Sequence, residues 1–306
     1  MEKVIIIVGP TAVGKTNLSI KLAKKLNAEV ISGDSMQVYK GMDIGTGKVT
    51  EKEMEHIPHH MLNILHPDDP FSVADYQKRV QRTISDLNKR NITPLLVGGS
   101  GLYIQAVLYD YVFSNQKRDE TLTKQLEARL ETEGNLALYE ELQQVDPVQA
   151  ENIHPNNKRR LIRALEVYQA TGKTLSERQS EQSKTSKYDY YIIGLKMDRE
   201  TLYEQINQRV DTMIQNGLVE EVKYLYKQGY ENTQAMKAIG YKELIPYIKG
   251  ETDLDAAVQL LKRNSRRYAK RQYTWFKNQM NIHWYDVTNT KYDKIVDNII
   301  KDMSEV

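Results

Sequence analysis

The residues best suited to chemistry lie close to the start of the chain. They are Gly9, Pro10, Thr11, Ala12, Val13, Gly14, Lys15 and Thr16. This run matches the pattern G-x-x-x-x-G-K-[ST], in which backbone N–H groups turn inward around an anion. The lysine of the pattern reaches the outer phosphate oxygens, and the final hydroxyl binds Mg²⁺. The run therefore predicts a phosphate site, with Thr16 as a metal ligand.

The flanking residues predict the elements that such a loop needs. Val4 to Val8 is an apolar, β-branched run that is typical of a buried strand. Leu18, Leu22 and Leu26 recur every four positions and predict a helix directly after the loop. The N-terminus of that helix adds a partial positive charge beside the bound anion.

A carboxylate follows the next predicted strand. Ala28 to Ser32 is typical of a strand, and Asp34 comes just past its end. Ligands of an open parallel sheet bind beyond the carboxyl ends of its strands, so Asp34 is a candidate to face the same ligand. An aspartate that closes a turn or caps a helix would occupy the same position. The residue alone leaves both interpretations open.

The following elements extend the α/β pattern. A helix is predicted from Ser72 to Leu87 and a strand from Thr93 to Val97. Gly98 and Gly99 follow this strand directly. Nucleotide-hydrolysing motors place an acidic residue near Mg²⁺ after a comparable strand. The glycines therefore argue against an NTP-driven motor.

Four histidines gather between Asp34 and the helix predicted from Ser72, at His56, His59, His60 and His66. A metal site would need them on one face at a fixed spacing, and the neighbouring prolines break any helix that could present them so. The pattern favours loop or hydrogen-bonding histidines.

The character of the chain changes between residues 114 and 187. This segment is polar and helical in pattern, and it predicts a helical insertion in an α/β core formed by residues 1–113 and 188–306. The core resumes with a strand from Tyr190 to Leu195. Inside the insertion, one helix opens with a basic run that contains Arg159, Arg160 and Arg163. Such a run is either a solvated face or an anion-binding face.

Two later helices also carry cations. Arg209 lies beside the apolar stripe of a helix that Asp198 is expected to cap, and its spacing alone is that of a surface residue. The segment from Lys262 to Lys277 interleaves many cations with four aromatic rings. Cations neutralise phosphates and rings stack on unpaired bases, although an amphipathic helix with solvated charges fits the same pattern.

Composition limits the other possibilities. The 306 residues carry a net charge of +2, so any basic surface must be local. Cysteine is absent, which excludes disulfides and thiolate zinc sites and fits a reducing cytoplasm. The early apolar run is too short for a membrane span.

The ordered motifs together resemble one family. GPTAVGKT, GDSMQVYKGMDIGTGK, PHHMLNI, LLVGGSGLY, HPNNKRRLIRALEVY, MKAIGYKEL and KRQYTWF follow one another as in the bacterial tRNA dimethylallyltransferases, the tRNA isopentenyltransferase family. The resemblance runs from Val4 to about Asp286. It implies a P-loop NTPase-like parallel sheet flanked by helices, with a helical insertion domain that contacts tRNA.

The resemblance also implies a reaction. The dimethylallyl group of dimethylallyl diphosphate passes to the exocyclic N6 amine of the adenosine next to the anticodon on its 3′ side, and diphosphate leaves. The implied enzyme is cytoplasmic and Mg²⁺-dependent, and its P-loop holds the prenyl diphosphate rather than ATP. Nothing in the sequence demands more than a monomer.

Residue roles come with the resemblance. Lys15, Thr11 and Arg209 contact the diphosphate, and Asp34 accepts the proton of the amine. The implied tRNA contacts are Asp34, Ser35, Met36, Gln37, Ser100, Arg159, Arg160, Leu161, Ile162 and Arg163. Ser100 stands where many relatives carry threonine, and the hydroxyl is retained.

A small-molecule kinase, for example of a nucleoside, is the alternative. It would use the same loop for ATP, with Asp34 activating a hydroxyl. The two basic helices favour the tRNA hypothesis, because the kinase of a small metabolite has no use for them. A non-catalytic RNA-binding protein would leave the complete phosphate loop without a role.

Overall fold

The computed structural model describes residues 1–111, 113, 119–181 and 185–305. The chain divides into two compact units, Met1–Leu108 with Ser186–Val306, and Tyr109–Thr185. Each unit buries an apolar cluster of its own. The boundaries of the predicted insertion lie within a few residues of this division, and position 114 itself falls outside the described residues.

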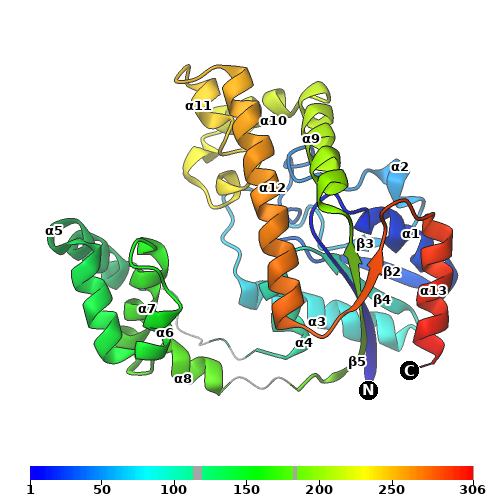
Figure 1. Cartoon of the computed structure of the whole chain (residues 1–306), viewed down its shortest axis with the longest axis horizontal. Coiled ribbons are helices and arrows are strands. Elements are labelled where there is room, and N and C mark those ends of the chain that lie inside the picture. Colours follow the sequence, from blue (N-terminus) through cyan, green and yellow to red (C-terminus); the bar gives the residue numbers. More distant parts are fainter. Residues whose placement is uncertain (112, 114–118, 182–184, 306) are drawn as a thin grey trace. The chain divides into compact units, whose positions relative to one another are not determined.

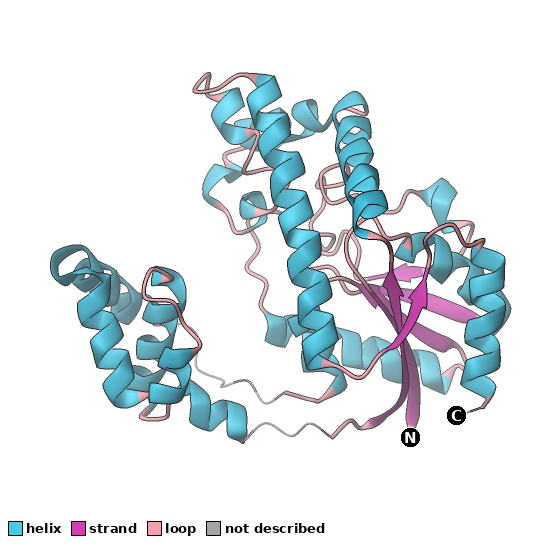
Figure 2. Cartoon of the chain, viewed as in Figure 1, coloured by secondary structure: helices cyan, strands magenta, loops and turns pink. Residues whose placement is uncertain are grey.

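The larger unit is built on a six-stranded sheet with the order β3-β2-β4-β1-β5-β6. Every pair of neighbours is parallel, with Ile5 opposite Leu95 and Ile6 opposite Ile192 (Figure 2). The strands are β1 (Glu2–Val8), β2 (Ala28–Ser32), β3 (His59–His60), β4 (Thr93–Gly98), β5 (Tyr188–Lys196) and β6 (His283–Asp286). The α/β class with a parallel sheet, predicted from the sequence, is confirmed.

Helices lie on both sides of the sheet (Figure 1). α1 (Lys15–Leu26) and α13 (Tyr292–Ser304) share one apolar cluster with the strands, through residues such as Leu18, Leu22 and Ile295. α3 (Val73–Lys89) packs against β1, β4 and α4 (Gly101–Leu108). The hydroxyl of Tyr76 on α3 donates to the carbonyl of Ser32 at 3.0 Å, which ties the helix to the end of β2.

The remaining helices follow β2 and β5. They are α2 (Glu51–Met54), α9 (Arg199–Gln215), α10 (Leu218–Lys227), α11 (Ile245–Ile248) and α12 (Leu254–Gln279), with 3₁₀ turns at Tyr230–Asn232 and Ala235–Lys237. Asp198 caps α9, as predicted, because its carboxylate accepts two backbone N–H groups. α12 is joined to α9 by the ion pair of Lys262 with Asp211 at 2.6 Å.

The helices are the regular elements among the described residues of the smaller unit, and turns and loops connect them. The unit contains α5 (Glu120–Val145), which is kinked at Gly134, α6 (Pro147–Glu151), α7 (Lys158–Thr171) and α8 (Leu175–Ser180). Gly172 ends α7 in a left-handed conformation, with φ of 69°. Leu126, Leu138 and Leu165 belong to the core of this unit.

Among the described residues, no helix combines the length and the apolar composition that crossing a membrane requires.

Candidate active site

The phosphate loop joins the end of β1 to the start of α1, as the sequence predicted. Lys15 is the first residue of α1, and its Nζ donates to the carbonyl oxygens of Gly9 at 2.9 Å and Pro10 at 2.7 Å. The ammonium group is thereby folded back over the loop. Of the eight loop residues, those that line the cleft are Thr11, Ala12, Gly14, Lys15 and Thr16, whereas Gly9, Pro10 and Val13 are buried behind it.

Arg209 brings a second cation to the same cleft. It projects from α9, and Lys15, Asp34 and Arg209 all line the cleft. Burial, followed by the charge of Arg209, lowers the pKa of Lys15 to about 7, and Asp34 opposes the shift. Burial also lowers the pKa of Arg209. Two partly desolvated cations close together favour a bound polyanion, which would relieve their repulsion.

Asp34 closes a turn, which is one of the two interpretations that the sequence left open, and it also lines the cleft. Its Oδ1 accepts the backbone N–H of Met36 at 2.8 Å, so the carboxylate closes a turn after β2. Asp34 also lines the same cleft as the two cations, and its charge acts on the pKa of Lys15 and of Arg209. A carboxylate that is oriented by a backbone N–H and faces the phosphate site is placed to accept a proton.

Ser100 meets the turn after β2 because β2 and β4 are neighbours. Its Oγ accepts the backbone N–H of Ser35, and its own N–H donates to the carbonyl of Gly33, each at 3.3 Å. These residues were predicted from different motifs, and the sheet order brings them together. Met36 is half-buried in the same turn.

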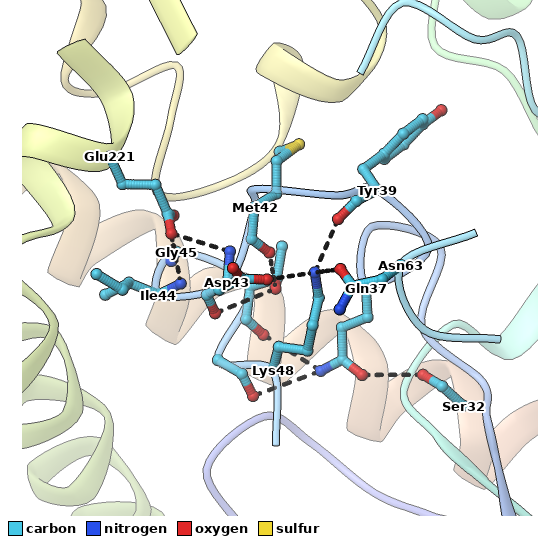
Figure 3. Close-up of polar contacts among 12 residues, drawn as sticks. Ser32, Gln37, Tyr39, Met42, Asp43, Ile44, Gly45, Lys48, Asn63 and Glu221 are labelled. Atoms are coloured by element: carbon cyan, nitrogen blue, oxygen red, sulfur yellow. Dashed lines mark hydrogen bonds and ion pairs between the residues drawn. The ribbon is translucent and has the colours of Figure 1, made fainter. Parts of the chain in front are cut away.

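Gln37 is engaged within the protein. Its Oε1 accepts a hydrogen bond from Ser32 Oγ at 2.9 Å, and its Nε2 points to the carbonyl oxygens of Thr46 at 3.4 Å and Gly47 at 3.5 Å (Figure 3). Its side chain therefore links β2 to the glycine-rich loop that follows. An RNA contact from Gln37 would have to share these bonds.

The basic run of α7 has two kinds of residue. Arg159, Arg160 and Arg163 are exposed, and Arg163 pairs with Glu166 at 2.9 Å. Leu161 and Ile162 were expected to contact tRNA, but their side chains are buried in the core of the smaller unit. Apolar side chains on that face of α7 stabilise a small helical unit, so the RNA contact proposed for this run rests on the arginines.

The histidine-rich segment makes hydrogen bonds. His60 Nε2 contacts Glu29 Oε2, and His59 Nδ1 contacts the carbonyl of Ile57, each at 2.7 Å. Within the described part of the chain, no three His, Cys, Asp or Glu side chains gather in a group that could hold a metal ion.

Two residues of α12 belong to the site. The sequence pointed to this helix but assigned neither residue to the site. Gln272 Oε1 accepts the backbone N–H of Thr11 at 2.8 Å, and Gln272 Nε2 donates to the carbonyl of Gly99 at 3.0 Å. Tyr268, one turn earlier, lines the cleft, and burial raises its pKa to about 12. A buried polar residue on the inner face of a helix is the signal that could have pointed to Gln272.

The fold and the cleft define a class. A parallel sheet in which a strand is followed by a glycine-rich loop, a lysine and a helix is typical of α/β phosphate-binding proteins of the P-loop class. Within that class, the model of the IPP transferase family matches residues 37–279. The chain belongs to this family.

Relatives match over nearly the whole chain. A tRNA dimethylallyltransferase of Oceanobacillus iheyensis is 57% identical over 100% of this chain and 97% of its own length. One of Bacillus subtilis is 56% identical over 94% of this chain and 91% of its own. These alignments extend beyond the matched region of the family model.

Solved structures show the same fold. The tRNA isopentenylpyrophosphate transferase of Bacillus halodurans is 47% identical, with a TM-score of 0.77 and coverage of 100% of this chain and 96% of its own. A eukaryotic dimethylallyltransferase, described as acting on tRNA, is 33% identical, with a TM-score of 0.84 and coverage of 100% and 80%.

Proposed function

We propose that this protein transfers the dimethylallyl group from dimethylallyl diphosphate to the exocyclic N6 amine of the adenosine next to the anticodon on its 3′ side. The names of its relatives support transfer to tRNA, and they do not favour the kinase alternative. The observation that carries the proposal is geometric. Lys15, Arg209 and Asp34 line one cleft, and the charge of Asp34 acts on the pKa of both cations.

The residues account for both halves of the transfer. The bond between the first prenyl carbon and the diphosphate oxygen breaks, and negative charge builds on the departing diphosphate. Lys15, Arg209 and the N–H groups of the P-loop stabilise that charge. The amine nitrogen bonds to the same prenyl carbon and gives its proton to Asp34, and general-base help of this kind contributes roughly 10²–10⁴-fold. The adenine must leave the anticodon-loop stack to enter the cleft.

The residues of the site also fit a Mg²⁺ ion that has few protein ligands. Thr16 is exposed in the first turn of α1 and lines the cleft beside Lys15. Because the described residues offer no cluster of three metal-binding side chains, the protein alone does not form a cage. Mg²⁺ characteristically keeps waters and binds through few protein groups plus substrate phosphates. Thr16 would hold the ion with the diphosphate, and the ion would neutralise the developing charge.

Basic surfaces on both units are proposed to bind the anticodon stem-loop. Arg159, Arg160 and Arg163 are exposed on α7, as are Arg267 and Arg271 on α12. Cations of this kind neutralise backbone phosphates. We place this enzyme in the cytoplasm, because its proposed substrate is tRNA, and we propose that it acts as a monomer.

The proposal is tested by direct modification. Purified protein is incubated with Mg²⁺, unmodified tRNA and dimethylallyl diphosphate, and the digested nucleosides are weighed by mass spectrometry. We expect an adenosine heavier by one five-carbon prenyl group, and we expect it to be absent with Asp34→Ala. No new nucleoside, together with ATP turnover on a small acceptor, would overturn the proposal in favour of a kinase.

A further inference from the structure

The glycine-rich segment Met42–Lys48 contacts two residues of the site through its backbone. The carbonyl oxygens of Thr46 and Gly47 lie at 3.4 and 3.5 Å from Gln37 Nε2. The guanidinium of Arg209 packs so closely on Gly47 that a Cβ atom there would lie 1.7 Å from Nη2. The position of this segment therefore limits where Arg209 can sit.

A single carboxylate holds the start of this segment. Glu221 Oε2 accepts the backbone N–H groups of Asp43 at 2.9 Å and Ile44 at 2.8 Å, and Glu221 Oε1 accepts that of Gly45 at 3.0 Å (Figure 3). Successive N–H groups that converge in this way form an anion-binding concavity. Hydrogen bonds to a charged acceptor are roughly twice as strong as neutral ones.

Tyr241 completes the contact from a motif that the proposed reaction leaves without a role, MKAIGYKEL. Its hydroxyl donates to Glu221 Oε1 at 2.6 Å, and its fully buried ring covers Gly45. A Cβ atom on Gly45 would lie 2.5 Å from that ring. Burial, followed by the charge of Glu221, raises the pKa of Tyr241. Its hydroxyl therefore keeps its proton and remains a donor to Glu221.

The other end of the segment is held by Lys48. Its buried Nζ donates to the carbonyl of Tyr39 at 2.7 Å, to Asp43 Oδ1 at 2.6 Å and to Asn63 Oδ1 at 2.6 Å (Figure 3). With Glu221 at one end and Lys48 at the other, the segment is tied to the rest of the larger unit on both sides of Gly47.

We propose that Glu221 is a positioning residue of the transfer reaction, which acts through Met42–Lys48 on Arg209. Its carboxylate is hydrogen-bonded to Asp43, Ile44, Gly45 and Tyr241, and Glu221 is not among the described residues that line the cleft. The proposal rests on the proposed function only in assigning Arg209 to the diphosphate.

The test uses inorganic diphosphate with Mg²⁺ as the probe, measured by calorimetry on the full chain. Glu221→Gln replaces one acceptor oxygen by a donor that faces the N–H groups. We expect diphosphate affinity to fall about 10- to 100-fold, because a small displacement of a binding group can have an effect of this size. Glu220→Gln, the exposed neighbour on the same helix, is the matched control and is expected to bind like the wild type.

The substitution Glu221→Gln in the Arg209→Ala variant tests whether the effect of Glu221 on binding depends on Arg209. In Arg209→Ala, the further substitution Glu221→Gln is expected to cause almost no additional loss, because coupled residues are not additive. Tyr241→Phe removes one donor and keeps the ring over Gly45, so it is expected to weaken binding less than Glu221→Gln. This milder variant keeps the test valid if Glu221→Gln fails to fold.

Two results would overturn the proposal. One is a Glu221→Gln protein that binds fewer moles of diphosphate at unchanged affinity, as a purely structural role would give. The other is an equal loss of affinity with and without Arg209. Neither measurement includes tRNA or prenyl transfer, so a failure of the proposed function, seen as no modified nucleoside with wild-type protein, is recognised separately.

Discussion

Gln272 on α12 accepts a hydrogen bond from the backbone N–H of Thr11 at 2.8 Å, across 261 positions of the chain. The other end of its amide donates to Gly99 at the carboxyl end of β4. One side chain thus joins the phosphate loop to the strand that precedes Ser100. The same helix exposes Lys270 and Arg271 next to this buried amide, so the helix proposed to contact RNA also holds the phosphate loop.

Gln272→Met keeps the size of the side chain and removes both bonds. We expect kcat/KM for the prenyl diphosphate to fall about 10- to 100-fold, because the loop loses a fixed contact. Leaving the N–H and the carbonyl unpaired should lower the free energy of unfolding by about 1–3 kcal/mol. Gln279→Met at the exposed end of α12 is the control for steady-state kinetics and urea unfolding. Equal kinetics in the two variants would remove Gln272 from the site.

Local patterns in the sequence predicted most of the larger unit. The strands at Ala28–Ser32 and Thr93–Gly98 and the helix at Val73–Lys89 were found because apolar periodicity and caps are local signals. β3 was missed because it has only two residues, both histidine. β6 and α13 were also missed. For β6 the reason is that His283–Asp286 has no continuous apolar run that would mark a strand.

The site was predicted only in part, for a different reason. The phosphate loop and Asp34 follow strands directly, so the rule for parallel sheets locates them. Gln272 and Glu221 depend on the packing of α12 and α10 against distant loops, and no local pattern encodes that packing. Leu161 and Ile162 were included because a contiguous motif was carried over whole, and the structure adds that their side chains lie on the buried face of the helix.

Lys15 is expected to be required for departure of the diphosphate. Lys15→Ala should lower kcat by about 10²–10³-fold, because it removes a donor aimed at the developing charge. Lys89→Ala, an exposed lysine at the end of α3, is the control. Single-turnover prenyl transfer measures the step itself, and near wild-type rates in Lys15→Ala would exclude this role.

The pKa of Lys15 predicts a pH dependence of diphosphate binding. Burial and Arg209 lower this pKa to about 7, so the amine of the free protein is charged below pH 7 and neutral above it. Only the charged form attracts the diphosphate, and binding above pH 7 must include uptake of a proton. Affinity should therefore fall as the pH rises from 7, by at most about tenfold per pH unit.

Lys15→Met separates this effect from titration of the ligand, which both proteins experience equally. Calorimetry with inorganic diphosphate between pH 6 and pH 9 should give a steeper loss of affinity for the wild type than for Lys15→Met. Parallel curves would show that Lys15 does not titrate in this range.

Asp34→Asn should separate binding from chemistry. The amide still accepts the N–H of Met36, so the turn is kept, but it cannot take the proton of the amine. We expect near-normal affinity for both substrates and a transfer rate lower by roughly 10²–10⁴-fold. Filter binding of tRNA and single-turnover transfer measure the two quantities. Substantial retained transfer would remove Asp34 as the base.

Arg160 tests the RNA-binding role of the smaller unit. It is exposed in the first turn of α7, and a phosphate contact from it would release counterions from the RNA. Arg160→Ala should weaken tRNA binding and reduce the slope of log affinity against log salt by about one, with diphosphate affinity unchanged. Lys173→Ala in the same unit removes a cation that is already paired with Glu181 at 2.7 Å and should leave the slope unchanged. Equal slopes for Arg160→Ala and the wild type would place the RNA contact elsewhere, with the exposed cations of α12 as the next candidates.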